Sequence, residues 1–149
     1  MATYNFTDGS IENQMVPPEM EIVTTQPTIL RNIVDCSLQT LDAGDGDVGI
    51  VLNIPANTTV LECGIRIITA ETADGTLDLG VTGVNVDQWG AALAVDSAVG
   101  TILGMLSAPL HFASADTIDV LATTDTNDVD LDGLQFEVFA VCIKQVDTY

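Results

Sequence analysis

Short runs in which apolar and polar residues alternate recur from Thr28 onward, with turn signals between them about every ten residues. In the longest run, Thr59–Ala70, four apolar residues alternate with Glu62, Gly64 and Arg66, which is the pattern of a half-buried β-strand. The four are Leu61, Cys63, Ile65 and Ile67. The other clear strand signals are Thr28–Leu38, Gly49–Ile54, Thr76–Val81, Thr117–Thr123 and Gly133–Gln145, and weaker ones are Val99–Leu106 and Leu110–Phe112. This spacing predicts an all-β fold, an antiparallel two-sheet sandwich of jelly-roll type.

The alternation also predicts which side chains form the core. These are Leu61, Cys63, Ile65, Ile67, Leu77, Leu79, Ile118, Val120, Phe136 and Val138. The dipeptide Asp74-Gly75 predicts a hairpin between Thr59–Ala70 and Thr76–Val81. Asp87 has the character of a helix N-cap, so Gln88–Ala94 is expected to form a short helix or a loop.

Residues 1–27 differ from the rest of the chain. Their apolar residues follow neither a helical nor an alternating period, and Pro17, Pro18 and Pro27 oppose regular structure. We therefore expect an irregular N-terminal arm over 1–27 and a β-sandwich domain over 28–149. An arm that buries little of its own surface is expected to pack on a neighbouring chain. The expected interface residues of the arm are Tyr4, Phe6, Ile11 and Met15.

The charge of the chain excludes several partners. Among 149 residues, 22 are acidic and 3 are basic, which gives a formal net charge of −19. A nucleic-acid binder needs a basic stripe to neutralise phosphates, and the chain has none. The same charge argues against an anionic membrane surface. No apolar run approaches the roughly 20 residues that span a bilayer, and the first ten residues lack the basic and apolar regions of a secretory signal.

No residue pattern predicts catalysis. Cys36, Cys63 and Cys142 are odd in number and have no CxxC spacing, so they are expected to be buried free thiols. His111 is the only histidine, which leaves too few ligands for zinc and favours an ordinary strand residue. The count of acidic residues leaves paired carboxylates for glycoside hydrolysis open, but only 5% of residues are aromatic, and a sugar cleft is usually lined by them. We expect no enzyme and no cofactor.

One acidic run has two interpretations. Asp128, Asp130, Asp132 and Gly133 match the first positions of a calcium-binding EF-hand loop, but Phe139 stands where the bidentate glutamate belongs. The run is therefore either a calcium site of another kind or a solvated strand end. The second interpretation is favoured, because alternate residues of the run are acidic and would point outward, and no metal is expected.

Trp89, the single tryptophan, also has two interpretations. It either caps one end of the sandwich, which is favoured, or anchors a subunit contact, since tryptophan is enriched at interface hot spots.

A series of turn-and-strand motifs spans about half of the chain. The motifs are IPANTTVL at 54–61, GIRIITA at 64–70, GTLDLGVTG at 75–83, DQW at 87–89 and ASADTIDV at 113–120. Together they resemble a group of small structural proteins of tailed bacteriophages, especially phages of cyanobacteria and marine bacteria. The resemblance implies a jelly-roll-like head decoration, or cement, protein that binds the outside of the head and bridges major capsid subunits.

The resemblance agrees with the residue patterns. Outward strand positions expected to carry apolar residues are Val60, Ile68, Phe139, Val141 and Ile143, more than a monomer needs. We therefore expect a homo-oligomer, a trimer at a three-fold position of the capsid exterior, assembled in the host cytoplasm, where cysteines stay reduced. The alternatives are a neck, tail or fibre protein of the virion and a carbohydrate- or receptor-binding sandwich.

Overall fold

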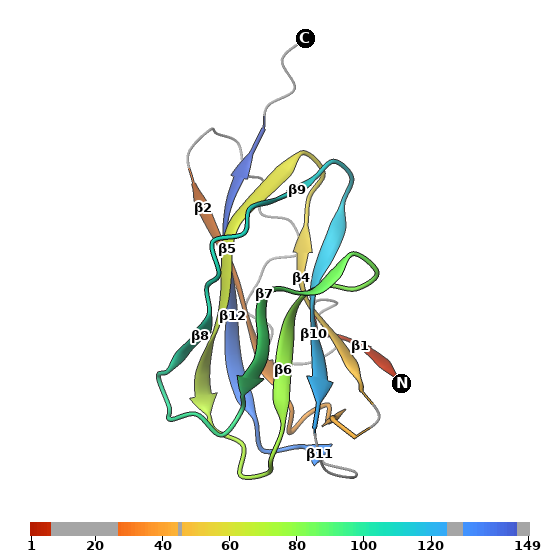
Figure 1. Cartoon of the computed structure of the whole chain (residues 1–149), viewed down its shortest axis with the longest axis vertical. Helices are drawn as coiled ribbons and strands as arrows, with labels where there is room; N and C mark the ends of the chain where they lie inside the picture. Colours follow the sequence, from red (N-terminus) through yellow and green to blue (C-terminus); the bar gives the residue numbers. More distant parts are fainter. Residues whose placement is uncertain (7–26, 45, 125–129, 146–149) are drawn as a thin grey trace.

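Two β-sheets packed face to face make up the protein (Figure 1). The computed structural model describes residues 1–6, 27–44, 46–124 and 130–145. Within these ranges the regular structure is entirely β, and no helix is long and apolar enough to cross a membrane. The all-β prediction is confirmed.

The first sheet has the strand order β1-β4-β10-β6-β7 and the second has the order β2-β12-β5-β8, with β9 also paired to β5. The strands of the first sheet are β1 (Thr3–Asn5), β4 (Val48–Ile54), β10 (Asp116–Thr123), β6 (Thr76–Val81) and β7 (Asn85–Ala94). Those of the second are β2 (Thr28–Asp35), β12 (Gln135–Lys144), β5 (Thr58–Thr69), β8 (Ile102–Gly104) and β9 (Leu110–Phe112). A small separate pair joins β3 (Leu41–Asp42) to β11 (Asp130–Leu131).

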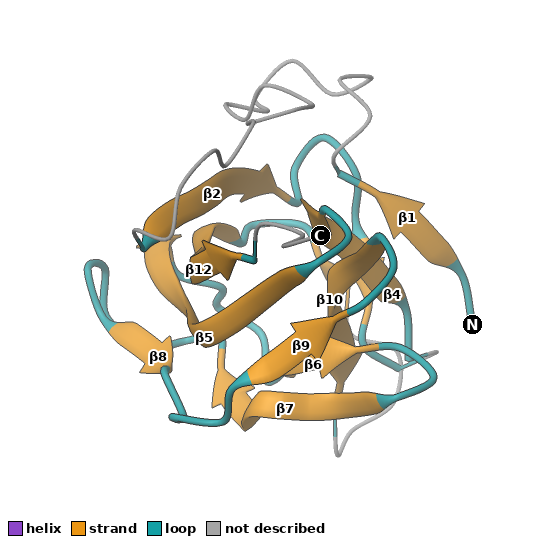
Figure 2. Cartoon of the chain, turned by 90° about the horizontal axis from the view of Figure 1, so that it is seen from above, coloured by secondary structure: helices purple, strands orange, loops and turns teal. Residues whose placement is uncertain are grey.

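The order of the strands is that of a jelly roll. Without the short β1, β3 and β11, and with β8 and β9 counted as one interrupted strand, eight strands remain. In chain order, the first, eighth, third and sixth form one sheet, and the second, seventh, fourth and fifth form the other. Figure 2 shows the two groups from above, with β2, β12 and β5 facing β4, β10 and β6. The predicted jelly-roll sandwich is confirmed.

The core lies between the sheets. Of the ten predicted core residues, all except Leu61 are buried. The exception has a local cause in the pairing of β5 with β12. Glu62 pairs with Val141 and Val60 pairs with Cys142, so Leu61 is an extra residue in a β-bulge. The bulge reverses the alternation, and Val60, which was predicted to face outward, is fully buried.

Residues 85–94 form strand β7, so the prediction of a short helix or loop over Gln88–Ala94 is wrong. A second bulge explains the irregular pattern, because Leu77 pairs with Leu93 whereas Leu79 pairs with Gly90. Within this bulge, Ala92 has a φ of 51°, and its N–H donates to Asp78 Oδ1 at 2.7 Å. This hydrogen bond supports a backbone conformation that alanine rarely adopts.

The predicted hairpin at Asp74-Gly75 is also wrong, because β5 and β6 lie in opposite sheets. The chain crosses between the sheets at residues 70–75, and Glu71, which is 6% exposed, holds this crossing in place. Its Oε1 accepts hydrogen bonds from the N–H groups of Thr72 (2.7 Å) and Ala73 (3.3 Å). Its Oε2 accepts one from the N–H of Gly133 at 2.9 Å, which ties the crossing to the loop before β12.

Candidate interaction surfaces

The first residues of the chain are part of the sandwich. Strand β1 pairs in parallel with β4, the only parallel pair among the described strands, and covers an edge that would otherwise expose unpaired backbone groups. The N–H of Ala2 donates to Asp47 Oδ1 at 2.7 Å, and the N–H of Val48 donates to the carbonyl of Ala2 at 2.8 Å. Asp47 is 3% exposed, and its charge raises the pKa of the neighbouring Tyr4 hydroxyl. The expected irregular arm therefore does not begin at residue 1.

Phe6 is a core residue with an exposed fraction of 1%. Its N–H donates to the carbonyl of Ile50 at 2.9 Å. Its carbonyl accepts a hydrogen bond from Asn32 Nδ2 at 3.1 Å, and the same amide nitrogen donates to Val51 O at 3.1 Å. Tyr4 is half-buried against the core. Phe6 therefore supports its own chain rather than facing a partner, while the expected interface residues Ile11 and Met15 lie outside the described residues.

The described residues on either side of 7–26 lie at neighbouring points of the sandwich. Phe6 is fixed beside Asn32, and β2 begins at Thr28, four residues earlier in the same strand. At about 3.3 Å per residue, these points are roughly 13 Å apart. The twenty residues 7–26 therefore connect two points of the sandwich that are about 13 Å apart.

The outer surface of the second sheet carries three cross-strand rows, which we call the arginine face. The rows run from β2 through β12 to β5 (side by side in Figure 1) and are Ile29–Val141–Glu62, Arg31–Phe139–Gly64 and Ile33–Glu137–Arg66. Above Gly64, Met105 covers the backbone, since a Cβ there would lie 2.8 Å from Met105 Sδ. The face is therefore largely apolar, with charged groups among the apolar ones.

Charge on the arginine face differs from that of the whole chain. Arg66 donates from Nε at 2.9 Å and from Nη2 at 2.6 Å to Glu137 Oε2. Arg31 Nη1 lies 3.8 Å from the other oxygen of the same carboxylate. These three rows hold two of the chain's three basic residues, and against Glu62 and Glu137 they give 2 − 2 = 0, in a chain of net charge −19. Asp35 follows in the next row, where Gln135 Nε2 donates to it.

This ionic group was missed by the sequence analysis. Arg66 and Glu137 are separated by 71 residues, and only the pairing of β5 with β12 brings them together. A signal was nevertheless present, because Arg31, Arg66 and Glu137 all occupy outward positions of predicted strands.

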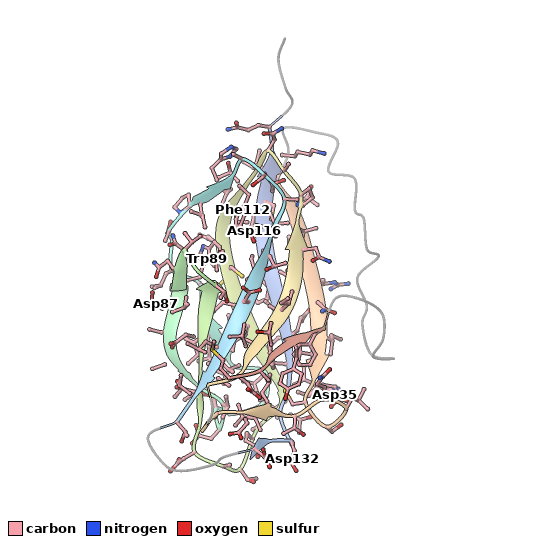
Figure 3. All side chains as sticks on the ribbon, turned by 90° about the vertical axis from the view of Figure 1, so that its right-hand side faces the viewer. Asp35, Asp87, Trp89, Phe112, Asp116 and Asp132 are labelled. Carbon is pink, nitrogen blue, oxygen red and sulfur yellow. The ribbon has the colours of Figure 1, made fainter. Side chains whose placement is uncertain are left out.

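Trp89 lies inside the core with an exposed fraction of 0%. Strand β7 points it inward, and its carbonyl accepts the N–H of Leu106 at 3.3 Å. Figure 3 places Trp89 and Phe112 in the same half of the sandwich, with Asp132 at the opposite end. A subunit anchor must be accessible to a partner, so this burial favours the capping interpretation.

The emission of Trp89 is expected to be that of a buried indole. Its fluorescence maximum should be blue-shifted, acrylamide should quench it weakly, and neither property should change on dilution, because the chain's own core surrounds the ring. A red shift on dilution to nanomolar protein would instead show that a second subunit covers Trp89.

The three cysteines are free and buried, as predicted. Burial raises the pKa of Cys36 and of Cys142 from 9.0 to about 12, and it also raises the pKa of Cys63. A nucleophilic cysteine needs a lowered pKa, so these groups are inert thiols at neutral pH. His111 Nδ1 lies 3.0 Å from Thr59 Oγ1 at the exposed end of β9 and β5.

No group of three or more potential metal ligands forms among the described residues. In the candidate calcium run, Asp130 and Asp132 are exposed, while Asp128 lies outside the described part of the chain. The residues of this run that can be placed show the exposure expected of a solvated strand end.

Comparison with known proteins identifies the fold. No family model matches the chain, and no curated protein matches its sequence. A chain of the cyanophage Pam1 capsid asymmetric unit is similar, with a TM-score of 0.57, 12% identity, and coverage of 88% of this chain and 93% of that chain. A chain of the Ralstonia phage GP4 capsid is similar with a TM-score of 0.56 and 14% identity, covering 99% of this chain and 100% of that chain. The protein thus has a sandwich fold that occurs in phage capsids.

Proposed function

We propose that this protein is a head decoration protein of a tailed phage, which binds the outside of the capsid and bridges neighbouring major capsid subunits. The observation that carries the proposal is the fold, which is shared with capsid chains over 88% and 99% of this chain's length. The phage-type motifs between residues 54 and 120 point the same way.

The proposed mechanism is mechanical. A protein that binds several capsid subunits at once buries additional interface, and this interface must be broken before the shell can rupture. Such a role needs no reacting group, and the three buried thiols, whose pKa values are raised, supply none at neutral pH. A trimer on the three-fold positions of the lattice would match the symmetry of its partner.

The segment 7–26 is proposed to make part of the contact with the capsid or with a sister subunit, through Ile11, Met15 and neighbouring residues. Because Phe6 belongs to the core, a deletion that tests this role must keep residues 1–6. A six-residue Gly/Ser linker in place of residues 7–26 suffices, since such a linker spans about 13 Å on average.

Binding of the linker variant to expanded empty heads is expected to be weaker by at least about tenfold, or about 1.4 kcal/mol. Cosedimentation measures this, with Val99→Ser, a change at a residue that is 69% exposed, as the control. Unchanged affinity would remove the role of the segment. If the full-length protein ignored heads and instead copurified with tails at low copy number, the decoration role itself would be wrong and a neck or fibre role would replace it.

A further inference from the structure

The arginine face has the properties of a binding surface for an acidic and apolar partner. Ile29 is 58% exposed, and the side chains of Arg31 and Arg66 are 68% and 48% exposed. The two guanidinium groups share the single carboxylate of Glu137, which is already bound by Arg66 through two hydrogen bonds. Arg31 is therefore able to take a further carboxylate beside the apolar side chain of Phe139, its cross-strand neighbour.

The chain itself contains a segment of the matching chemistry. Residues 7–26 include four carboxylates and no basic residue. The carboxylates are Asp8, Glu12, Glu19 and Glu21, and the large apolar residues between them are Ile11, Met15, Val16, Met20, Ile22 and Val23. Charge and hydrophobicity thus complement those of the arginine face, the only described sheet face that holds arginine.

We infer that the arginine face binds the segment 7–26 of a second copy of this chain, so that neighbouring copies are linked by exchanged segments. The inference rests on the homo-oligomer in the proposed function and identifies the surfaces that would form it. The carboxylates of the segment would bind Arg31 and Arg66, and its apolar side chains would cover Ile29, Phe139 and Val141.

The length of the segment favours a second copy over the chain's own face. The four strands from β2 to β8 are about 14 Å across at a spacing of 4.8 Å, so about nine extended residues would reach the far strand and return. The segment has twenty residues between its two fixed ends. Twenty fully extended residues span at most about 66 Å, so a chain of this length can extend up to about 30 Å from β2, beyond the width of its own sheet.

A charge exchange between two variants tests the inference. The face variant carries Arg31→Glu and Arg66→Glu, with Glu137→Gln to avoid an unpaired carboxylate. The segment variant carries Glu12→Lys, Glu19→Lys and Glu21→Lys. Each variant alone is expected to self-associate at least tenfold more weakly in analytical ultracentrifugation, whereas an equimolar mixture recovers association as pairs of unlike variants, because each reversed surface then meets its complement on the other copy.

The direction of the change in self-association distinguishes the proposed contact from a general effect of net charge. The segment variant changes the net charge from −19 to −13, which by itself favours association. The control with Asp74→Lys, Asp87→Lys and Asp96→Lys, all exposed, has the same net charge and is expected to associate at least as well as the unmodified protein. If the segment variant behaved like this control, or if the mixture failed to recover association, the inference would be wrong.

Cross-linking decides between the possible occupants of the face. A photoreactive benzoylphenylalanine at position 141, in a mixture of ¹⁴N- and ¹⁵N-labelled protein, is expected to link to residues 7–26 of the opposite isotope. Links within one isotope only would place the segment on its own chain and overturn the inference.

A monomer that still bound heads, or links to the major capsid protein alone, would overturn the inference and leave the proposed function intact. If copies exchanged segments but did not bind heads, the inference would be supported and the proposed function would be wrong.

Discussion

Replacing Phe6 by alanine is expected to lower the free energy of unfolding by about 3–5 kcal/mol, the range for a phenylalanine removed from a packed core. Phe6 is among the largest fully buried side chains of the protein. Its ring packs on Gly49, where an added Cβ would lie 2.8 Å from Phe6 Cε2, so strand β4 leaves room for this ring alone. Urea unfolding followed by Trp89 fluorescence measures the change.

The control for this prediction is Phe6→Leu, which keeps most of the apolar volume and should cost less than about 1.5 kcal/mol. If Phe6→Ala cost less than 1 kcal/mol, the ring would not be part of the core, and residues 1–27 would be a removable arm after all. With the expected result, a truncation of residues 1–27 would lose head binding through unfolding, and only variants that retain residues 1–6 report on the contact.

The strands of this protein could be predicted from its sequence because each sheet has one buried and one outward face. Alternation then marks the strands directly, and the predicted bounds Thr76–Val81 and Leu110–Phe112 agree with the structure residue for residue. Phe136 and Val138 were assigned correctly to the core for the same reason.

The sequence-based predictions are wrong where pairing with a neighbouring strand determines the backbone conformation of a segment. The bulge at Leu61 depends on the register against β12, and no local pattern distinguishes Thr58 and Val60 from the residues after the bulge. In β7, the bulge at Ala91 and Ala92 adds one residue and disrupts the alternation, so the segment has no clear strand period until it is paired with β6. Hydrophobicity alone cannot assign the partner of an isolated side chain, and Phe6 was therefore expected in an interface rather than in its own core.

The residues of the arginine face also could not be grouped from the sequence, because their contacts depend on strand pairing. Outward positions can be predicted from alternation, and Phe139 and Val141 were expected to be apolar residues on an outer face. The pairing of Arg31 and Arg66 with one carboxylate requires the order β2-β12-β5, which places residues from three distant segments in two adjacent rows of one face. Composition identifies the chain as acidic, but only topology shows that its arginines gather on a face of zero net charge.

The protein is expected to lose stability steeply above pH 9 because of its buried thiols. Burial raises the pKa of Cys36 and Cys142 from 9.0 to about 12 in the folded state. Between these values the unfolded chain releases the thiol protons and the folded protein retains them, so rising pH favours unfolding. Each thiol contributes about 1.4 kcal/mol per pH unit, which is on the order of 5 kcal/mol for the two at pH 11.

Such a loss is comparable to the whole stability of many domains, about 5–15 kcal/mol. Urea unfolding curves at intervals from pH 8 to pH 11 measure the slope, and the double variant Cys36→Ala, Cys142→Ala is the control. The variant starts from a lower stability at pH 7, because each change leaves a small cavity, but its stability should fall less steeply above pH 9 since the two thiols no longer titrate. Equal slopes for both proteins would show instead that the alkaline loss comes from the growing negative charge of the surface, whose repulsion added salt would screen.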